Sequence, residues 1–171
     1  MRLYHISLTP NITTLIPKKP SHFLTKHLLE EGKTKRISFS PSIKNCLRAV
    51  GASRNKIYYV YSPTAIDMKY LYRPLREEVP DSRLTNEYWY LKPVNVKLVA
   101  VVKAGKVVDP KVFYIGGRNS AVFGISHGYE YETIKRYRNG KEIKQKTKVK
   151  PNEQPEEQKL SFWQKLLKKN K

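Results

Sequence analysis

The chain has 171 residues, of which 34 are Lys or Arg and 14 are Asp or Glu, so its formal net charge is +20. Eight glycines and one cysteine exclude collagen-like and disulfide-rich classes, and no apolar run approaches the roughly 20 residues that span a bilayer. Because the single cysteine permits no internal disulfide and the N-terminus lacks a signal-peptide core, we expect a soluble cytoplasmic protein without a transmembrane segment.

The first forty residues predict two strands and a helix between them. Residues 2–7 predict a strand that is covered on both faces, since strict apolar alternation is absent. A loop marked by its prolines follows over 8–20. Capping residues flank a helix predicted over 22–31, and a second strand is predicted over 36–40.

The helix predicted over 42–50 has the clearest pattern in the chain. Ser40 can serve as its N-cap, Pro41 suits its first position and Gly51 suits its exit. One apolar stripe follows the helical period and consists of Ile43, Cys46, Leu47 and Val50. We therefore expect a short amphipathic helix packed on a sheet, with Cys46 as a core residue rather than a nucleophile.

Several further strands are predicted after this helix. Their ranges are 56–61, 87–91, 96–103, 112–115 and 121–125, with a long loop over 73–86 and a turn at Gly105. Because one or two short helices accompany this many strands, the expected fold class is α+β, with a compact strand-rich body.

A basic hairpin is predicted over 129–149, because Asn139-Gly140 is the strongest short turn signal. The cations of this hairpin include Lys135, Arg136, Arg138, Lys141, Lys144, Lys146 and Lys148. Beyond it the chain is a polar stretch followed by a short basic helix. We therefore expect a single domain over 1–150 and a flexible linker with a helix over 151–171.

The positive charge favours a polyanionic partner, and nucleic acid is the commonest polyanion in a cytosol. Residues 131–171 hold 13 basic and 5 acidic side chains, about twice the charge density of residues 1–130, which hold 21 and 9. We expect the hairpin cations to contact nucleic acid or an anionic protein. The alternatives are a lysine-rich surface that serves solubility alone and an acidic membrane surface.

Three short pieces of sequence carry the candidate site residues. They are His5 in the first predicted strand, Ser38-Phe39-Ser40 at the end of the second, and Glu87 at the start of a later strand. No CxxC, HExxH, P-loop or GxGxxG pattern occurs, so we expect no metal site. In this order the three pieces resemble ADP-ribosyltransferases, over about residues 2–103.

The resemblance implies a role for each residue toward NAD as the substrate. His5, Ser38 and Ser40 would position NAD, Phe39 would stack on its nicotinamide, and Glu87 would be the catalytic carboxylate. Cleavage of the bond from nicotinamide to ribose passes through an oxocarbenium-like species, whose positive charge a carboxylate stabilises. An aromatic ring orients the nicotinamide by stacking, and a neutral histidine can hydrogen-bond a ribose hydroxyl.

Two positions depart from the family pattern. Thr85 stands where the family often has Gln or Glu, two residues before the catalytic Glu, and Phe39 stands where one branch has tyrosine. These departures leave open a changed acceptor, hydrolysis of NAD alone, or no catalysis. Ordinary structural roles also remain open for these residues. His5 is then a strand histidine, Ser40 a helix cap, Phe39 a core aromatic and Glu87 a solvated or arginine-paired acid.

The function expected from these observations is that of an ADP-ribosyltransferase-like protein which binds NAD and whose basic surface brings it to nucleic acid. The alternative is a non-catalytic basic nucleic-acid-binding or host-inhibitor protein of a mobile element. Convergence of His5, Ser40 and Glu87 in one pocket would favour the first.

Overall fold

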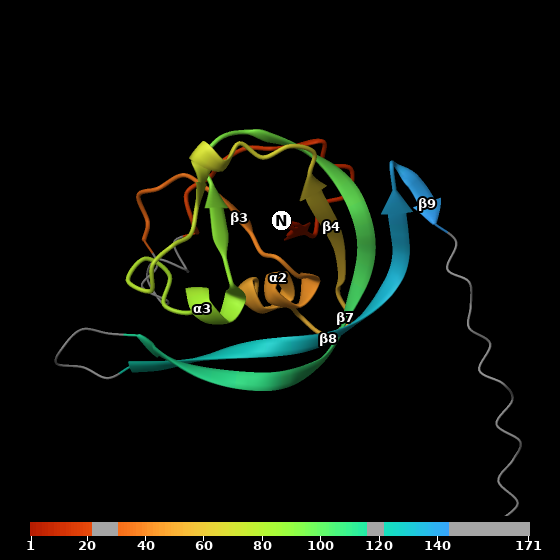
Figure 1. Ribbon diagram of the computed structural model, residues 1–171. Coiled ribbons are helices and arrows are strands. Elements are labelled where there is room, and N and C mark those ends of the chain that lie inside the picture. The colour runs from red at the N-terminus through yellow and green to blue at the C-terminus, as the bar shows by residue number, and fades with distance from the viewer. Residues whose placement is uncertain (22–30, 116–121, 144–171) are drawn as a thin grey trace, which may run out of the picture.

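The computed structural model describes residues 1–21, 31–115 and 122–143 (Figure 1). The helix predicted over 22–31 falls almost entirely outside these residues, as do the tail from 144 onward and the cations Lys144, Lys146 and Lys148. Within the described residues the protein is strand-rich, with short helices and antiparallel pairing throughout, which confirms the α+β class.

A six-stranded sheet forms the larger part of the fold. Its strands follow the order β1-β4-β7-β8-β9, and β2 pairs with β7 beside this path. The strand bounds are β1 His5–Ser7, β2 Thr14–Leu15, β4 Ile57–Pro63, β7 Val94–Ile115, β8 Val122–Arg138 and β9 Lys141–Ile143. The short strand β2 lies inside the segment expected to be a loop over 8–20, because Thr14 and Leu15 pair with Asn95 and Val94.

A three-stranded sheet of order β3-β6-β5 completes the body. Its strands are β3 Ile37–Phe39, β5 Leu71–Tyr72 and β6 Tyr88–Tyr90, so both strands expected to frame the chemistry are present. The hydrogen-bonded bridge between Tyr4 and Ser40 joins this sheet to the segment before β1. The two sheets thus meet where the residues of interest lie.

The short helices are α2 Ile43–Ala49, α3 Ser82–Thr85 and a 3-10 turn over Met68–Tyr70. Ser42 caps α2 by accepting a hydrogen bond from the Asn45 amide, so the predicted N-cap Ser40 is wrong by two residues. Gly51 has φ of +57° directly after α2, which is the left-handed exit expected of a glycine. Val50 is 52% exposed, so it does not extend the buried stripe.

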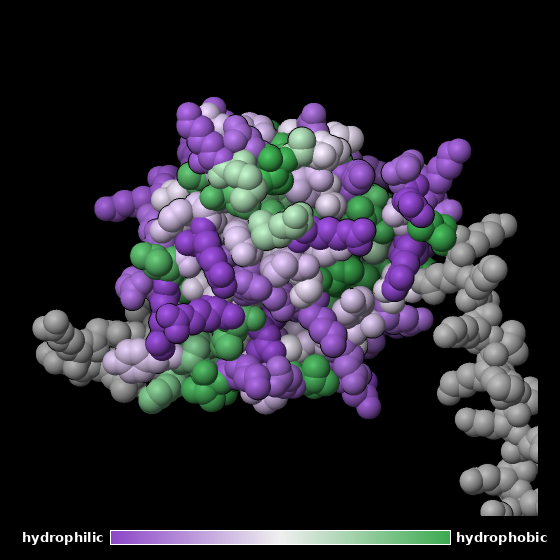
Figure 2. Space-filling model, in the orientation of Figure 1, coloured by the Kyte–Doolittle hydropathy of each residue, from purple (hydrophilic) through white to green (hydrophobic). Residues whose placement is uncertain are grey.

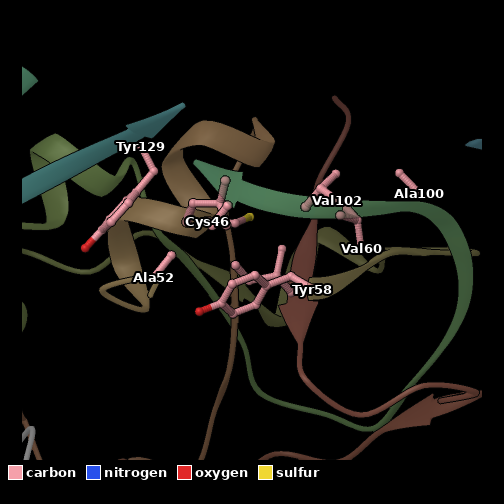
Figure 3. Packing of buried hydrophobic residues seen from close by; sticks show 10 residues of the cluster. Cys46, Ala52, Tyr58, Val60, Ala100, Val102 and Tyr129 are labelled. Carbon is pink, nitrogen blue, oxygen red and sulfur yellow. The ribbon is translucent and has the colours of Figure 1, made fainter. Parts of the chain in front are cut away.

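The first core cluster lies between α2 and the large sheet (Figure 3). Cys46 and Leu47 of α2 pack there against residues of β4, β7 and β8, among them Val60, Val102 and Tyr129. Cys46 is buried and free, and burial raises the pKa of its thiol to about 12. The prediction that Cys46 is a core residue is therefore confirmed.

Strands β7 and β8 form a long curved hairpin whose register shifts at several points along its length (Figure 1). The predicted turn at Gly105 is wrong, since β7 continues through it to Ile115. At one of these bulges Asp109 adopts φ of +47°, and its carboxylate and carbonyl accept hydrogen bonds from Arg48 of α2. Gly128 makes room for this arginine, because a Cβ there would lie 2.8 Å from the guanidinium.

The turn between β8 and β9 follows the prediction. Asn139 and Gly140 both have positive φ, 51° and 75°, which is the backbone of a type I′ turn. Arg138 pairs with Lys141 across the turn, and Arg136 pairs with Ile143. In the described part of the chain, no helix is long and apolar enough to cross a membrane.

Candidate active site

A cleft of about 780 Å³ lies along one side of β1 and β3. His5, Ser38 and Glu87 all line it, from β1, from β3 and from the residue that precedes β6. This volume is in the range of small-molecule sites, about 300–1,000 Å³. Three of the five residues that the sequence nominated therefore converge on one concave surface.

His5 is half-buried and its ring is oriented by the neighbouring strand. Its Nδ1 lies 3.0 Å from the Ser38 carbonyl oxygen, and since a carbonyl can only accept, Nδ1 carries the hydrogen. The Nε2 atom is then an acceptor. Burial lowers the pKa of His5, an effect that the Ser38 carbonyl partly offsets, so the ring is neutral at pH 7. A neutral imidazole with an acceptor nitrogen suits a ribose hydroxyl.

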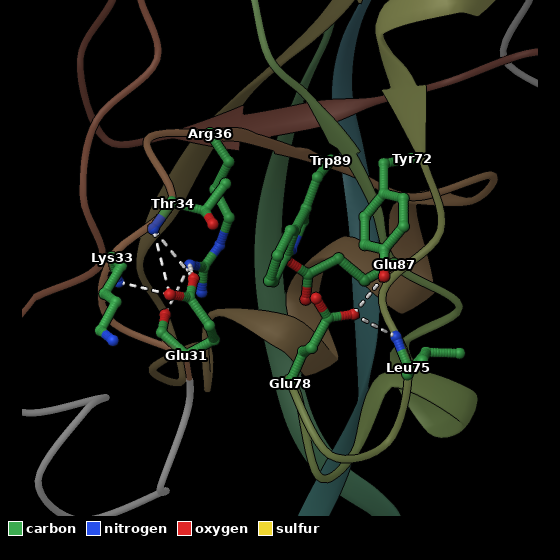
Figure 4. Close-up of polar contacts among 9 residues, drawn as sticks. All are labelled: Glu31, Lys33, Thr34, Arg36, Tyr72, Leu75, Glu78, Glu87 and Trp89. Carbon is green, nitrogen blue, oxygen red and sulfur yellow. Dashed lines mark hydrogen bonds and ion pairs between the residues drawn. The ribbon is translucent and has the colours of Figure 1, made fainter.

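Glu87 is 7% exposed, lines the cleft and lies beside Trp89 (Figure 4). Its Oε1 accepts a hydrogen bond of 2.9 Å from the indole Nε1 of Trp89. Burial raises the pKa of this carboxyl above its usual range, while hydrogen bonds from Ser38 and Trp89 and the charge of Arg36 oppose the shift. The carboxylate is thus fixed in position in a poorly solvated place, where its charge acts most strongly on a nearby cation.

Three cationic residues are also among those that line the cleft: Lys18, Lys19 and Arg36. The guanidinium of Arg36 lies 3.9 Å from the ring centroid of Trp89 and donates to the Glu31 carbonyl at 2.8 Å. Lys18 is paired with Arg36 through two backbone hydrogen bonds, and the exposed Lys19 follows it. Arg36 is buried and is ion-paired with the Glu31 carboxylate at 3.7 Å. The exposed Lys18 and Lys19 therefore supply the positive charge that the cleft offers to an anionic group of a ligand.

Phe39 and Ser40 do not line the cleft, although the Phe39 ring packs edge to face against the His5 ring, with centroids 6.1 Å apart. Phe39 is 1% exposed and packs with Leu3 and Tyr61 in the second core cluster, to which both sheets contribute. Ser40 is 2% exposed and is engaged with Tyr4 through backbone hydrogen bonds. Neither lines the cleft, so only His5 and Glu87 of the expected set His5, Ser40 and Glu87 converge there. The aromatic ring expected beside a nicotinamide is therefore part of the core at this position.

Thr85 is fully buried in α3, where its hydroxyl bonds to the carbonyls of Asp81 and Ser82. The position that departs from the family pattern therefore does not border the cleft. Sequence reasoning missed Arg36, Trp89 and Lys18. The Trp at two residues after Glu87 was a usable signal, because alternate residues of a strand share one face.

Comparisons with protein-family models, with curated proteins and with solved structures find no match to this chain. Among the residues that the structure describes, no group of three or more His, Cys, Asp and Glu side chains is arranged to hold a metal ion. The geometry of the cleft itself is therefore what bears on the chemistry.

Proposed function

We propose that this protein binds NAD in the cleft of His5, Ser38 and Glu87. It cleaves the bond between nicotinamide and ribose and transfers the ADP-ribose group to an acceptor or to water. The observation that carries the proposal is the convergence of these three residues from separate strands on one cleft of suitable size. The donor set suits NAD: cations for the pyrophosphate, an acceptor nitrogen for a ribose hydroxyl, and a carboxylate for the developing positive charge.

In the proposed reaction the C1′–N bond breaks with its electron pair going to the nicotinamide, and an acceptor nucleophile attacks C1′ and loses its proton. Glu87 stabilises the cationic ribose, and Ser38 and Trp89 hold its carboxylate in place. His5 positions a ribose hydroxyl through Nε2. Lys18 and Lys19 bind the phosphates.

We further propose that the basic surface brings the protein to nucleic acid or to a target bound to nucleic acid. The support is the net charge of +20. Hydrophilic residues cover much of the face seen in Figure 2. Not all of the nominated cations are available for such contacts, since Lys135 is paired with Glu142 at 3.1 Å. Arg136 and Arg138 have no such partner within the described residues.

Replacement of His5 by asparagine tests the cleft. Asparagine can still donate to the Ser38 carbonyl but lacks an acceptor at the place of Nε2. We expect KM for NAD to rise about ten-fold, the loss of one hydrogen bond to a ligand, with a smaller change in kcat. Nicotinamide release measures both, and the exposed His127→Asn is the matched control. Equal kinetics in both variants, or no NAD cleavage by the wild type with or without nucleic acid, contradicts the proposal.

The pH profile of NAD cleavage gives a second test. Only the ionised form of Glu87 stabilises a cation, and burial raises the pKa of this group. Activity should therefore be lost as the pH falls through that raised value, at a higher pH than for an exposed glutamate, about 4.3. His5, whose pKa burial lowers, also protonates on the acid side, so the profile is repeated with His5→Asn. An acid limb that disappears in this variant would assign it to His5 instead.

A further inference from the structure

A second cleft, of about 1050 Å³, lies on the face of the large sheet that α2 packs against. Ile43, the first residue of α2, lines one end of this cleft. The other lining residues include members of β4, β7 and β8. The segment Met1–Tyr4 and residues 62–66 border it. Ser62 pairs with Lys97 and Ala100 pairs with Arg136, so these side chains share the face of the sheet that carries the α2 core.

The charge of this second cleft is entirely positive. Four cations line it, Arg2, Lys97, Arg136 and Arg138, and no Asp or Glu is among its lining residues. All four are exposed, and within the described residues none of them makes an ion pair or a side-chain hydrogen bond. The adjacent Lys135, by contrast, faces the other side of β8 and is neutralised by Glu142. Cations that are collected in a concave surface and left unpaired are suited to a row of anionic groups.

The floor of the second cleft carries aromatic rings. Tyr4 and Tyr131 are half-buried against the α2 core and line the cleft beside the cations. Ser62 and Thr64 also line the cleft, and the Thr64 hydroxyl donates to the Asn95 carbonyl at 3.1 Å. Rings inside a basic groove stack on unpaired bases while the cations hold the phosphates, whereas paired bases in a duplex present no free face.

We propose that this second cleft binds a single strand of nucleic acid. The inference rests on the nucleic-acid part of the proposed function and makes it specific, but it does not depend on NAD cleavage. Phosphates would lie against Arg136, Arg138 and Lys97, and bases would stack on Tyr131 and Tyr4. An acidic peptide would match the charge but would leave the rings without stacking partners, so the single strand is the better fit.

The test compares two double variants that each remove two positive charges. Arg136→Ala with Arg138→Ala alters the second cleft, whereas Lys103→Ala with Lys135→Ala alters the opposite face of the same strands. Fluorescence anisotropy with labelled oligothymidine and oligouridine measures affinity. We expect the cleft variant to lose about ten-fold or more in affinity at low salt. The slope of log affinity against log salt concentration should become shallower by about 1.4, or 0.7 for each lost phosphate contact. The control should change less than two-fold.

Four further measurements test the stacking role of the rings, the preference for a single strand, the competition by an acidic peptide, and the independence from NAD cleavage. Tyr131→Leu should weaken binding of the single strand. The wild type should bind a duplex of the same length more weakly than it binds the single strand. Equal losses in both double variants, equal binding of duplex, or displacement of the strand by oligoglutamate at the same concentration would each overturn the proposal. Glu87→Gln should bind the strand normally. If the wild type binds the single strand but cleaves no NAD, only the transferase proposal fails. If it cleaves NAD but does not bind the single strand, only the single-strand proposal fails.

Discussion

Replacing Glu87 by glutamine should lower the rate of NAD cleavage by about 10²–10³-fold, the usual effect of removing one group that stabilises charge in the transition state. Glutamine has the same shape, and its carbonyl oxygen can still accept the hydrogen bond from the Trp89 indole. The measurement is nicotinamide release under saturating NAD. The matched control is Glu77→Gln, which changes an exposed glutamate in the loop that precedes α3.

The folded state of the Glu87→Gln variant should be at least as stable as the wild type at neutral pH. Burial raises the pKa of Glu87, so the ionised carboxylate is disfavoured in the fold, and the neutral amide removes that penalty. Glu87→Ala should behave differently, because the buried indole N–H would lose its acceptor at a cost of about 1–3 kcal/mol. Cleavage that is unchanged in Glu87→Gln would exclude this carboxylate from catalysis.

Shortening Leu47 to alanine should destabilise the protein by about 2–5 kcal/mol. Leu47 is 0% exposed and packs in the core cluster between α2 and the six-stranded sheet. For a chain of this size the loss corresponds to a fall in melting temperature of roughly 4–20 °C. Thermal unfolding followed by circular dichroism checks it, with the exposed Lys44→Ala on the same helix as control. A fall no larger than that of the control would show that α2 is not part of the core.

The features that the sequence predicted are those with strong local signals. The Asn139-Gly140 pair favours positive φ at both residues, which few other pairs allow, so the turn was predictable. The spacing of Cys46 and Leu47 follows the helical period, and both are buried as expected. The strands that carry His5 and Ser38, and the strand that follows Glu87, were found within two or three residues of their ends.

The features that it missed depend on pairing between distant segments. Gly105 carries the local signal of a turn, but β8 pairs along both sides of it and keeps β7 continuous. Ser38 and Phe39 are neighbours in one strand, so their side chains point to opposite faces and only one can enter the cleft. The second cleft joins Arg2, Lys97 and Arg136, which are far apart in the chain and meet only through the order of the strands.

The buried Cys46 has a practical consequence for spectroscopic work on the two clefts. Its thiol donates to the Tyr4 carbonyl, and burial raises its pKa to about 12, so the thiol form dominates at pH 7. Because the thiolate is the form that reacts, the folded protein resists oxidants and alkylating labels without further change. A cysteine introduced at an exposed position such as Lys97 would then be the thiol that takes up a label, and the native cysteine could stay in place.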